Sequence, residues 1–356
     1  MTEHPHRPRL RRSDCSSPGL RRVRRGRGFA YLDEDGAQVT DVESLARVRA
    51  LTIPPAWKEV WICADPLGHL QATGIDAAGR KQYLYHRAWR EKRDRDKFHK
   101  MVGFARALPR LRRRVAADLT GADPTRERVL ACAARLLDVG LFRIGSEEYA
   151  AEEGGGLGLA TIGREHVAIT RGSMVFDYPA KSGVRRVQAI DDPLSVDLVR
   201  VLKRRRGGGP QLLAYREGRR WVSVRSVEVN DYLKQQMGED FSAKDFRTWN
   251  ATVLAAVALA VDGGGARTKT ARRRAIDGAV RGVAELLGNT PAVARRAYID
   301  PRVFDRYLSG WTIGGVLNGL RDLDAPDDRT RLRIERAVLD LLSEESESRA
   351  LERVAA

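Results

Sequence analysis

Asn289 and Tyr298 lie in a stretch whose residue types could attack a phosphodiester. A helical pattern stops at Gly288, and Thr290-Pro291 restarts a helix as N-cap and first helical residue. A tyrosine hydroxyl has a pKa of about 10, so it becomes a nucleophile only where cations stabilise the phenolate and the attacked phosphate. Basic residues flank Tyr298, and the chemistry indicated is attack on a phosphate ester. The alternative is that Tyr298 only packs a helix junction.

Two arginines stand where they could receive that phosphate. Arg143 follows the expected end of a helix at Gly140 and lies between apolar residues, so we expect it to be partly buried and to need an anionic partner. Arg247 lies in the first turns of a helix that Ser242 opens. The partial positive charge of a helix N-terminus favours a phosphate there.

A lysine could supply a proton to the same reaction. Lys181 lies in the tight turn 179–183 between two expected strands, and a lysine on a hairpin tip can reach the floor of a groove. The alternative is an ordinary solvated turn lysine. The glycine-rich stretch 154–158 reads as a flexible loop and lacks the Gly-Lys-Ser/Thr ending of a P-loop, as does the rest of the chain, so nothing indicates ATP use.

Composition points to a nucleic acid as the partner. The chain has 356 residues and a formal net charge of +17, and no apolar run approaches the roughly 20 residues of a membrane span. Its three cysteines, Cys15, Cys63 and Cys132, are far apart and lack metal-ligand spacing. We therefore expect neither disulfides nor a metal site, and a reducing, cytoplasmic location without a secretory signal.

The chain divides into three expected parts. Residues 1–28 carry nine arginines among Ser, Pro and Gly, and we expect a disordered tail that adds salt-dependent attraction to phosphates; the alternative is a passive extension. Residues 29–100 show short β-rich runs with turns between them, which predict a small antiparallel sheet domain. Residues 101–356 show mainly helical periodicity with three short strands between 166 and 190, which predicts a larger, mostly α-helical domain with a β-meander.

Basic and aromatic residues alternate at the end of the small domain. Arg80 and Lys81 precede Tyr83 and Tyr85, which share one face if the segment is a strand. Such a face could lie along DNA. Packing within the sheet is the alternative.

Taken together, these motifs resemble the type IB DNA topoisomerases, specifically the small poxvirus-like bacterial form. The resemblance covers about residues 29–310. The sequence pieces that carry it are Gly79–Tyr85, Arg143–Tyr149, Lys244–Thr252 and Leu287–Pro291 with Tyr298. Each piece alone is a weak signal, but four in this order with this spacing are specific.

The resemblance implies an α+β fold forming a C-shaped clamp around double-stranded DNA. It implies a monomeric, nucleoid-associated enzyme that needs neither ATP nor metal and links Tyr298 to a DNA 3′-phosphate. Arg143, Arg247 and Asn289 would stabilise the transition state, and Lys181 would protonate the leaving 5′-oxygen. Tyr83, Tyr85 and Tyr149 match positions that contact DNA in the family.

The sequence departs from the family pattern at two places, and two alternative functions stay open. Many relatives carry His where this chain has Asn289, and the 154–158 stretch is looser than usual, so its contacts with DNA are open. A tyrosine recombinase shares the Arg/Lys/Arg/Tyr chemistry, but such enzymes usually have His at the position of Lys244. A non-catalytic basic DNA-binding protein is the other alternative, and the complete set of five residues argues against it.

Overall fold

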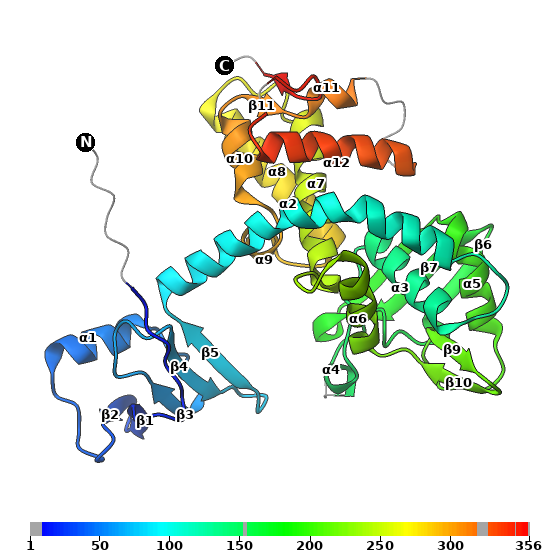
Figure 1. Cartoon of the computed structure of the whole chain (residues 1–356). Coiled ribbons are helices and arrows are strands. Elements are labelled where there is room, and N and C mark those ends of the chain that lie inside the picture. Colours follow the sequence, from blue (N-terminus) through cyan, green and yellow to red (C-terminus); the bar gives the residue numbers. More distant parts are fainter. Residues whose placement is uncertain (1–8, 152–154, 319–326, 346, 355–356) are drawn as a thin grey trace. The chain divides into compact units, whose positions relative to one another are not determined.

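The computed structural model describes residues 9–151, 155–318, 327–345 and 347–354. The chain forms two compact units, Met1–Phe98 and His99–Ala356, and Figure 1 labels their elements. Helix α2 (Arg87–Asp118) begins in the first unit and continues in the second. Among the helices of the described ranges, none combines the length and the apolar character that crossing a bilayer requires.

The first unit is a five-stranded antiparallel sheet with the strand order β2-β1-β3-β4-β5. Its strands are β1 (Leu20–Arg25), β2 (Gly28–Leu32), β3 (Lys58–Ile62), β4 (Leu70–Ile75) and β5 (Lys81–Tyr85). Helix α1 (Val42–Ala50) is capped by Asp41, whose carboxylate accepts from the Ser44 amide at 2.7 Å. Its Val48 packs with Val60, Ile62 and Ala72 in a small core.

The predicted disordered tail over residues 1–28 is wrong for the part that the structure describes. Strand β1 pairs with both β2 and β3, and Leu20 packs against the small core. The Arg22 guanidinium donates to the carbonyls of Ile53, Pro54 and Trp57 at 3.1, 3.0 and 2.7 Å. These backbone and side-chain bonds compensate for the high charge of the segment. Residues 1–8 lie outside the described ranges.

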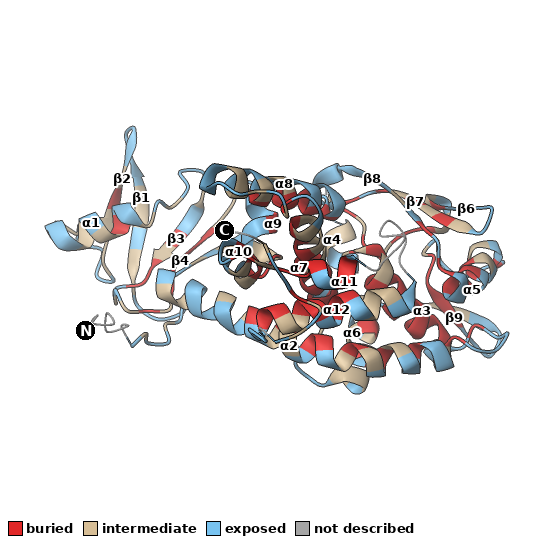
Figure 2. Cartoon of the chain, turned by 90° about the horizontal axis from the view of Figure 1, so that it is seen from above, coloured by how far each residue is buried: buried red, intermediate tan, exposed pale blue. Residues whose placement is uncertain are grey.

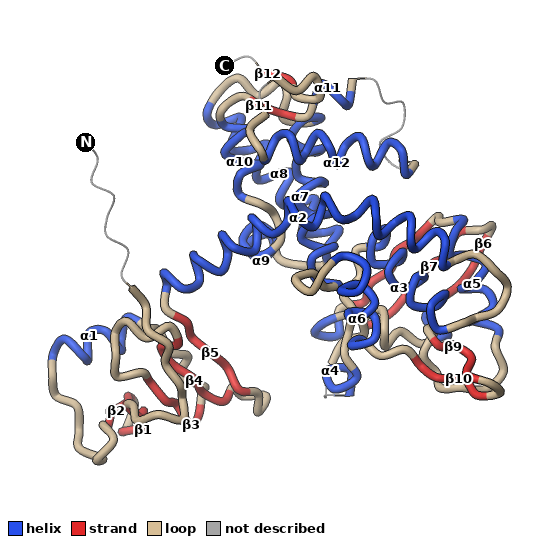
Figure 3. Tube along the Cα trace, viewed as in Figure 1, coloured by secondary structure: helices blue, strands red, loops and turns tan. Residues whose placement is uncertain are grey.

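The second unit is mainly helical (Figure 3). Its further helices are α3 (Arg126–Gly140), α4 (Glu147–Ala151), α5 (Pro193–Arg204), α6 (Ser226–Met237), α7 (Ala243–Val261), α8 (Lys269–Leu287), α9 (Pro291–Ala297), α10 (Pro301–Leu308), α11 (Gly314–Leu317) and α12 (Asp328–Leu342). Its strands are β6 (Val167–Thr170), β7 (Ser173–Pro179), β8 (Arg185–Ile190), β9 (Ala214–Glu217), β10 (Arg220–Ser223), β11 (Trp311–Thr312) and β12 (Glu352–Arg353). The meander order is β6-β7-β8, and β9-β10 and β11-β12 form two further pairs. The predicted α+β class, with an N-terminal antiparallel sheet and a larger helical domain, is confirmed.

Helices α3 and α7 form the centre of the second unit. Most of their residues are buried (Figure 2), including Trp249 with no exposed surface. Both helices are buried on most sides because other elements surround them, and their buried residues include charged ones such as Arg135, Asp138 and Arg247. Helix α3 starts at Arg126 with Thr125 as N-cap, whose side chain accepts from the Arg128 amide.

The end of α3 is shaped by a glycine and by a strained leucine. A Cβ on Gly140 would lie 2.5 Å from the Phe142 ring and 2.6 Å from Ile190, so only glycine fits. The left-handed turn falls on the next residue, Leu141, with φ of 53°. A branched side chain rarely adopts this conformation, and the turn directs the chain into the loop that carries Arg143.

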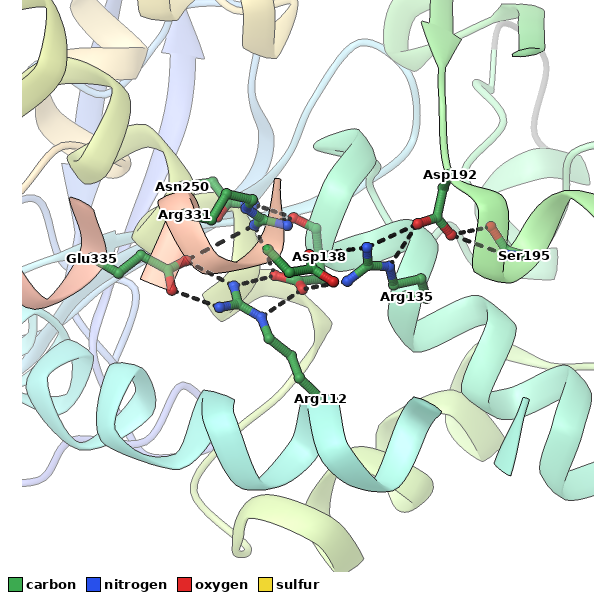
Figure 4. A network of polar contacts seen from close by, with 9 residues as sticks. Arg112, Arg135, Asp138, Asp192, Ser195, Asn250, Arg331 and Glu335 are labelled. Carbon is green, nitrogen blue, oxygen red and sulfur yellow. Dashed lines mark hydrogen bonds and ion pairs between the residues drawn. The ribbon is translucent and has the colours of Figure 1, made fainter. Parts of the chain in front are cut away.

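A buried network of charges links the helices around the C-terminal end of α3 (Figure 4). Arg112 of α2 forms paired bonds to Asp138 at 2.8 and 2.9 Å and to Glu335 of α12 at 2.6 and 2.7 Å. Arg331 of α12 reaches Asp138 at 3.0 Å, and Asn250 of α7 donates to the Asp138 carbonyl at 2.9 Å. The network therefore links α2, α3, α7 and α12 close to the segment that leads to Arg143.

This network changes the acidity of its central carboxyl. Burial alone would raise the pKa of Asp138, but the charges of Arg331 and Arg112 outweigh it and hold that pKa well below its usual value. A second branch of the network joins Arg135 to Asp192 of the α5 N-cap at 2.9 Å. Breaking a buried pair of this kind leaves an uncompensated charge in the core.

Candidate active site

The site is built on the end of helix α8. Gly288 adopts a left-handed conformation with φ of 60°, and the Asn289 amide donates back to the Ala284 carbonyl at 2.9 Å. This glycine termination ends the helix and turns the chain. Thr290 then caps α9 by accepting from the Val293 amide at 3.4 Å, with Pro291 as the first residue of the helix, as predicted.

Three arginines bond to three successive carbonyls at this helix end. Arg186 donates to Leu286 O at 2.7 Å, Arg247 to Leu287 O at 2.8 Å and Arg143 to Gly288 O at 3.4 Å. The last carbonyls of a helix lack partners within the helix and carry partial negative charge, so they are natural acceptors for guanidinium groups. Residues from β8, from α7 and from the loop after α3 meet here, although they are distant in sequence.

Asn289 and Arg143 form a direct pair. The Oδ1 atom of Asn289 accepts from Nη2 of Arg143 at 2.6 Å, which fixes the orientation of the amide. Its Nδ2 atom is buried and finds no acceptor among the described residues. We expected Arg143 to need an anionic partner, but no carboxylate in the described part of the chain pairs with it. The pair therefore combines a cation that has no carboxylate partner with an amide donor, Nδ2, that has no acceptor among the described residues.

Arg247 is the most deeply held of the three arginines. It is 2 % exposed, and it donates to Leu141 O, the carbonyl of the left-handed residue, as well as to Leu287 O. Burial, and then the charge of Arg143, lower its pKa to about 10. Its guanidinium carbon lies 5.2 Å from the centre of the Tyr298 ring.

Tyr298 caps the end of α9 and is half-buried. Its amide donates to Ala294 O at 3.0 Å, and its carbonyl accepts from the buried Thr252 hydroxyl at 3.4 Å. Burial would raise the pKa of the phenol, but the charges of Arg247, Arg143 and Lys244 outweigh burial and lower it. A lower pKa brings a phenol closer to a usable nucleophile.

Lys181 is exposed in the short turn between β7 and β8, where Ser182 has φ of 64°. It lines the same cleft as Arg143, a cavity of about 780 Å³. Its Nζ lies 5.9 Å from the centre of the Tyr149 ring. Arg143, Arg247, Asn289 and Tyr298 thus gather at the ends of α8 and α9, whereas Lys181 faces the cleft from its turn.

The glycine-rich stretch is packed where the structure describes it, which corrects the expectation of a flexible loop. A Cβ on Gly156 would lie 2.3 Å from the Ala180 carbonyl carbon and 2.4 Å from the Lys181 nitrogen. One on Gly158 would lie 2.4 Å from the Gly145 nitrogen. Residues 155–158 therefore pack between the Arg143 loop and the Lys181 turn. Residues 152–154 lie outside the described ranges.

The predicted aromatic face is present in the first unit. Tyr83 and Tyr85 of β5 are 47 % and 38 % exposed, and their rings stack with centres 6.3 Å apart. Lys81 Nζ lies 5.9 Å from the Tyr83 ring centre, and Arg80 pairs with Asp76 at 3.0 Å. Two exposed aromatic rings with basic side chains beside them are a combination that can lie along a nucleic-acid strand.

Comparison with known proteins gives the family. The model of the eukaryotic DNA topoisomerase I catalytic core matches residues 86–307, which is more than half of the chain and includes the five candidate residues. The chain belongs to the type IB DNA topoisomerases. The model of the bacterial DNA topoisomerase IB N-terminal domain matches residues 28–76 of the same enzyme.

A viral protein is similar over most of the enzyme. The DNA topoisomerase 1B of Acanthamoeba polyphaga mimivirus is 28 % identical over 299 residues, which cover 81 % of this chain and 87 % of that protein. The family match ends at residue 307, so helix α12, which carries Arg331 and Glu335 of the charge network, lies after the matched core.

Sequence reasoning missed Arg186 and Gln188 of β8. Arg186 was one more basic residue in a basic strand, and no local pattern marked its bond to a carbonyl 100 positions away. Sequence reasoning also gave Thr252 no role beyond its place in the Lys244–Thr252 motif. Its hydroxyl accepts from the Asp300 amide at 3.1 Å and so fixes the backbone between α9 and α10, directly after Tyr298.

Proposed function

We propose that this enzyme relaxes supercoiled double-stranded DNA by cutting and resealing one strand at a time through Tyr298. The Tyr298 oxygen gives its proton to solvent water and forms a bond to a backbone phosphorus, while the bond from phosphorus to the 5′-oxygen breaks. Lys181 gives its proton to that 5′-oxygen. The DNA is then held as a 3′-phosphotyrosyl link, its free end rotates, and the reverse attack restores the strand.

The observation that carries this proposal is the chemistry around Tyr298. The phenol lies beside Arg247, and Arg143 and Asn289 offer further donors for which no carboxylate partner exists in the described residues. Such a set is suited to a pentacoordinate phosphorane, on which negative charge builds up. The two arginines and the amide would contact its non-bridging oxygens, and neither ATP nor a metal ion enters the reaction.

The first unit would bind the same DNA by its aromatic face. Arg80, Lys81, Tyr83 and Tyr85 would contact backbone and sugar, and Tyr149 would do so from the second unit. These contacts hold the duplex without reading its sequence. We propose that the two units, Met1–Phe98 and His99–Ala356, act as separate DNA-binding and catalytic domains within one monomer.

The test is relaxation of a negatively supercoiled plasmid that carries no chosen target site. With EDTA present and ATP absent, the full chain should convert the plasmid to a ladder of relaxed forms. A requirement for a specific paired site would favour a recombinase. Binding without any change of linking number would favour a non-catalytic DNA-binding protein.

A further inference from the structure

The cleft beside the end of α8 holds more donors than the five candidate residues supply. It has a volume of about 780 Å³, and its lining includes Arg143, Lys181, Arg186, Gln188 and Gly288. Arg186 and Gln188 lie on β8, two positions apart and therefore on the same side of the strand. Nothing in the reaction described above uses either of them.

Two nitrogens of the Arg186 guanidinium, Nε and Nη2, are hydrogen-bonded, whereas Nη1 is available to a ligand. Its Nη2 donates to Leu286 O at 2.7 Å, and its Nε and Nη2 donate to Gln188 Oε1 at 2.9 and 2.8 Å. Its Nη1 lies beside the turn of α8, 3.1 Å from where a Cβ on Gly288 would stand. The guanidinium is therefore oriented before any ligand arrives.

Gln188 has a donor that is directed but unused. Because its Oε1 accepts from Arg186, the orientation of the amide is determined, and Nε2 must lie on the other side. That Nε2 atom is buried and has no hydrogen-bond partner among the described residues. Leaving a buried donor unpaired is unfavourable, so an acceptor is expected there.

The surroundings favour an anion as that acceptor. Burial lowers the pKa of Arg186, and the nearby charge of Arg143 lowers it further. Neither arginine forms an ion pair with a carboxylate in the described part of the chain. The neighbouring Arg185 is already paired with Asp177 at 2.6 Å, and one exposed carboxylate, Glu285, also lines the cleft.

We propose that Arg186 and Gln188 form a second phosphate site, which binds a backbone phosphate next to the one that Tyr298 attacks. Nη1 of Arg186 and Nε2 of Gln188 would donate to its non-bridging oxygens. The site rests on the proposed function, since the DNA strand must already lie across Arg143. Holding the adjacent phosphate would fix the strand in line for attack, so the site contributes to positioning as well as to affinity.

The experiment uses duplex oligonucleotides in which one phosphate at a time, on either side of the cleavage point, is replaced by an uncharged methylphosphonate. Single-turnover formation of the covalent adduct is measured for the native chain, Arg186→Ala, Gln188→Glu and Arg185→Ala. Gln188→Glu keeps an oxygen for Arg186 but places a negative charge where the phosphate would lie. Arg185→Ala removes one positive charge from the same strand and serves as the matched control.

The native chain should lose roughly ten- to a hundredfold in cleavage rate at one flanking position, as expected for a charged hydrogen bond. Arg186→Ala and Gln188→Glu should be slower by a similar factor on unmodified DNA. Neutralising that one phosphate should slow Arg186→Ala no further, while Arg185→Ala should remain as sensitive as the native chain.

Two results would overturn the proposal. One is that Arg186→Ala and Gln188→Glu cleave unmodified DNA at the native rate. The other is that Arg186→Ala remains fully sensitive at every flanking position, which would make Arg186 only a support for α8. If the native chain forms no adduct on unmodified DNA, the proposed function itself fails, and the two failures are thus distinguishable.

Discussion

The Oδ1 atom of Asn289 accepts a hydrogen bond of 2.6 Å from Nη2 of Arg143. One amide thereby orients an arginine with its acceptor and keeps its donor Nδ2 free of any partner among the described residues. A carboxylate at this position would pair with Arg143 and repel a phosphate. The amide gives the same orientation without that charge, which explains why an uncharged residue suits the position.

Replacing Asn289 tests this double role. Asn289→Ala should lose roughly a hundredfold in the rate of cleavage and of religation alike, because both pass through the same phosphorane and removal of one preorganised donor typically costs about 3 kcal/mol. Single-turnover measurements in both directions check this. A native rate for Asn289→Ala would reduce the residue to a helix-junction role.

Asn289→His should retain substantial activity and gain a pH dependence. A neutral imidazole can accept from Arg143 with one nitrogen and donate with the other, whereas the protonated ring cannot accept. Its activity should therefore fall as the pH decreases through about 6.5 or below, since neighbouring arginines disfavour the charged ring. The native enzyme should lack this step between pH 5 and 7, and identical pH profiles would contradict the assignment.

Lys181→Ala should slow cleavage of ordinary DNA by roughly 10²–10⁴, the usual contribution of acid–base catalysis. A substrate with sulfur in place of the bridging 5′-oxygen has a leaving group that needs no proton. The variant should cleave that substrate at close to the native rate. Equal slowing on both substrates would remove Lys181 from the role of general acid.

Gly156→Ala should also impair proton delivery, through displacement of the Lys181 turn. A Cβ there would lie 2.3 Å from the Ala180 carbonyl carbon, and overpacking of this kind typically costs about 1–3 kcal/mol. Cleavage of ordinary DNA should slow, and the sulfur-containing substrate should restore part of the rate. Gly278→Ala is the control, because a Cβ on this residue of α8 would have no other atom within 4 Å. Native activity in both variants would show that the contact of Gly156 does not position Lys181.

Asp138→Asn should lower the free energy of unfolding by about 3–5 kcal/mol, since it leaves buried arginines without their carboxylate. The pKa of Asp138 is lowered on folding. Its contribution is therefore complete above the unfolded value of about 3.9 and is lost as the pH falls below that value toward the folded pKa. Urea unfolding from pH 7 down to pH 2.5 should show a shallower acid loss in Asp138→Asn than in the native chain.

Asp197→Asn is the control for that measurement. Asp197 pairs with Arg200 on the exposed face of α5, and an exposed pair contributes less than about 1 kcal/mol. Equal destabilisation by the two substitutions would mean that the buried network contributes no more than a surface pair.

Local signals in the sequence predicted the elements that carry the site. Ser242 and Thr290 cap α7 and α9 as expected, and Gly288 ends α8 in the left-handed conformation. These features depend on side chains within four residues of each other, so a single sequence contains them. That Arg143, Lys181, Arg247, Asn289 and Tyr298 act together in one site was inferred from their chemistry and from the family resemblance.

Long-range contacts could not be predicted in the same way. The bonds from Arg186 to Leu286 and from Arg143 to Asn289 join residues about 100 and 146 positions apart, and no periodicity encodes them. The N-terminal segment was misjudged because its charge suggested disorder, whereas the pairing of β1 with β3 depends on residues some 40 positions later. Deletion of residues 1–28 would therefore remove a strand and not only a tail.

The measurement that tests the central claim most directly is the identification of the residue that becomes linked to DNA. The full chain is incubated with a duplex, denatured with SDS and digested, and the peptide attached to the DNA 3′-phosphate is sequenced by mass spectrometry. The DNA should be found on Tyr298, and the variant Tyr298→Phe should form no adduct. Tyr307→Phe should form the full adduct, because the buried hydroxyl of native Tyr307 donates to Gly263 O at 2.8 Å and is not available for attack. An adduct on any other residue, or one that persists in Tyr298→Phe, would contradict the account.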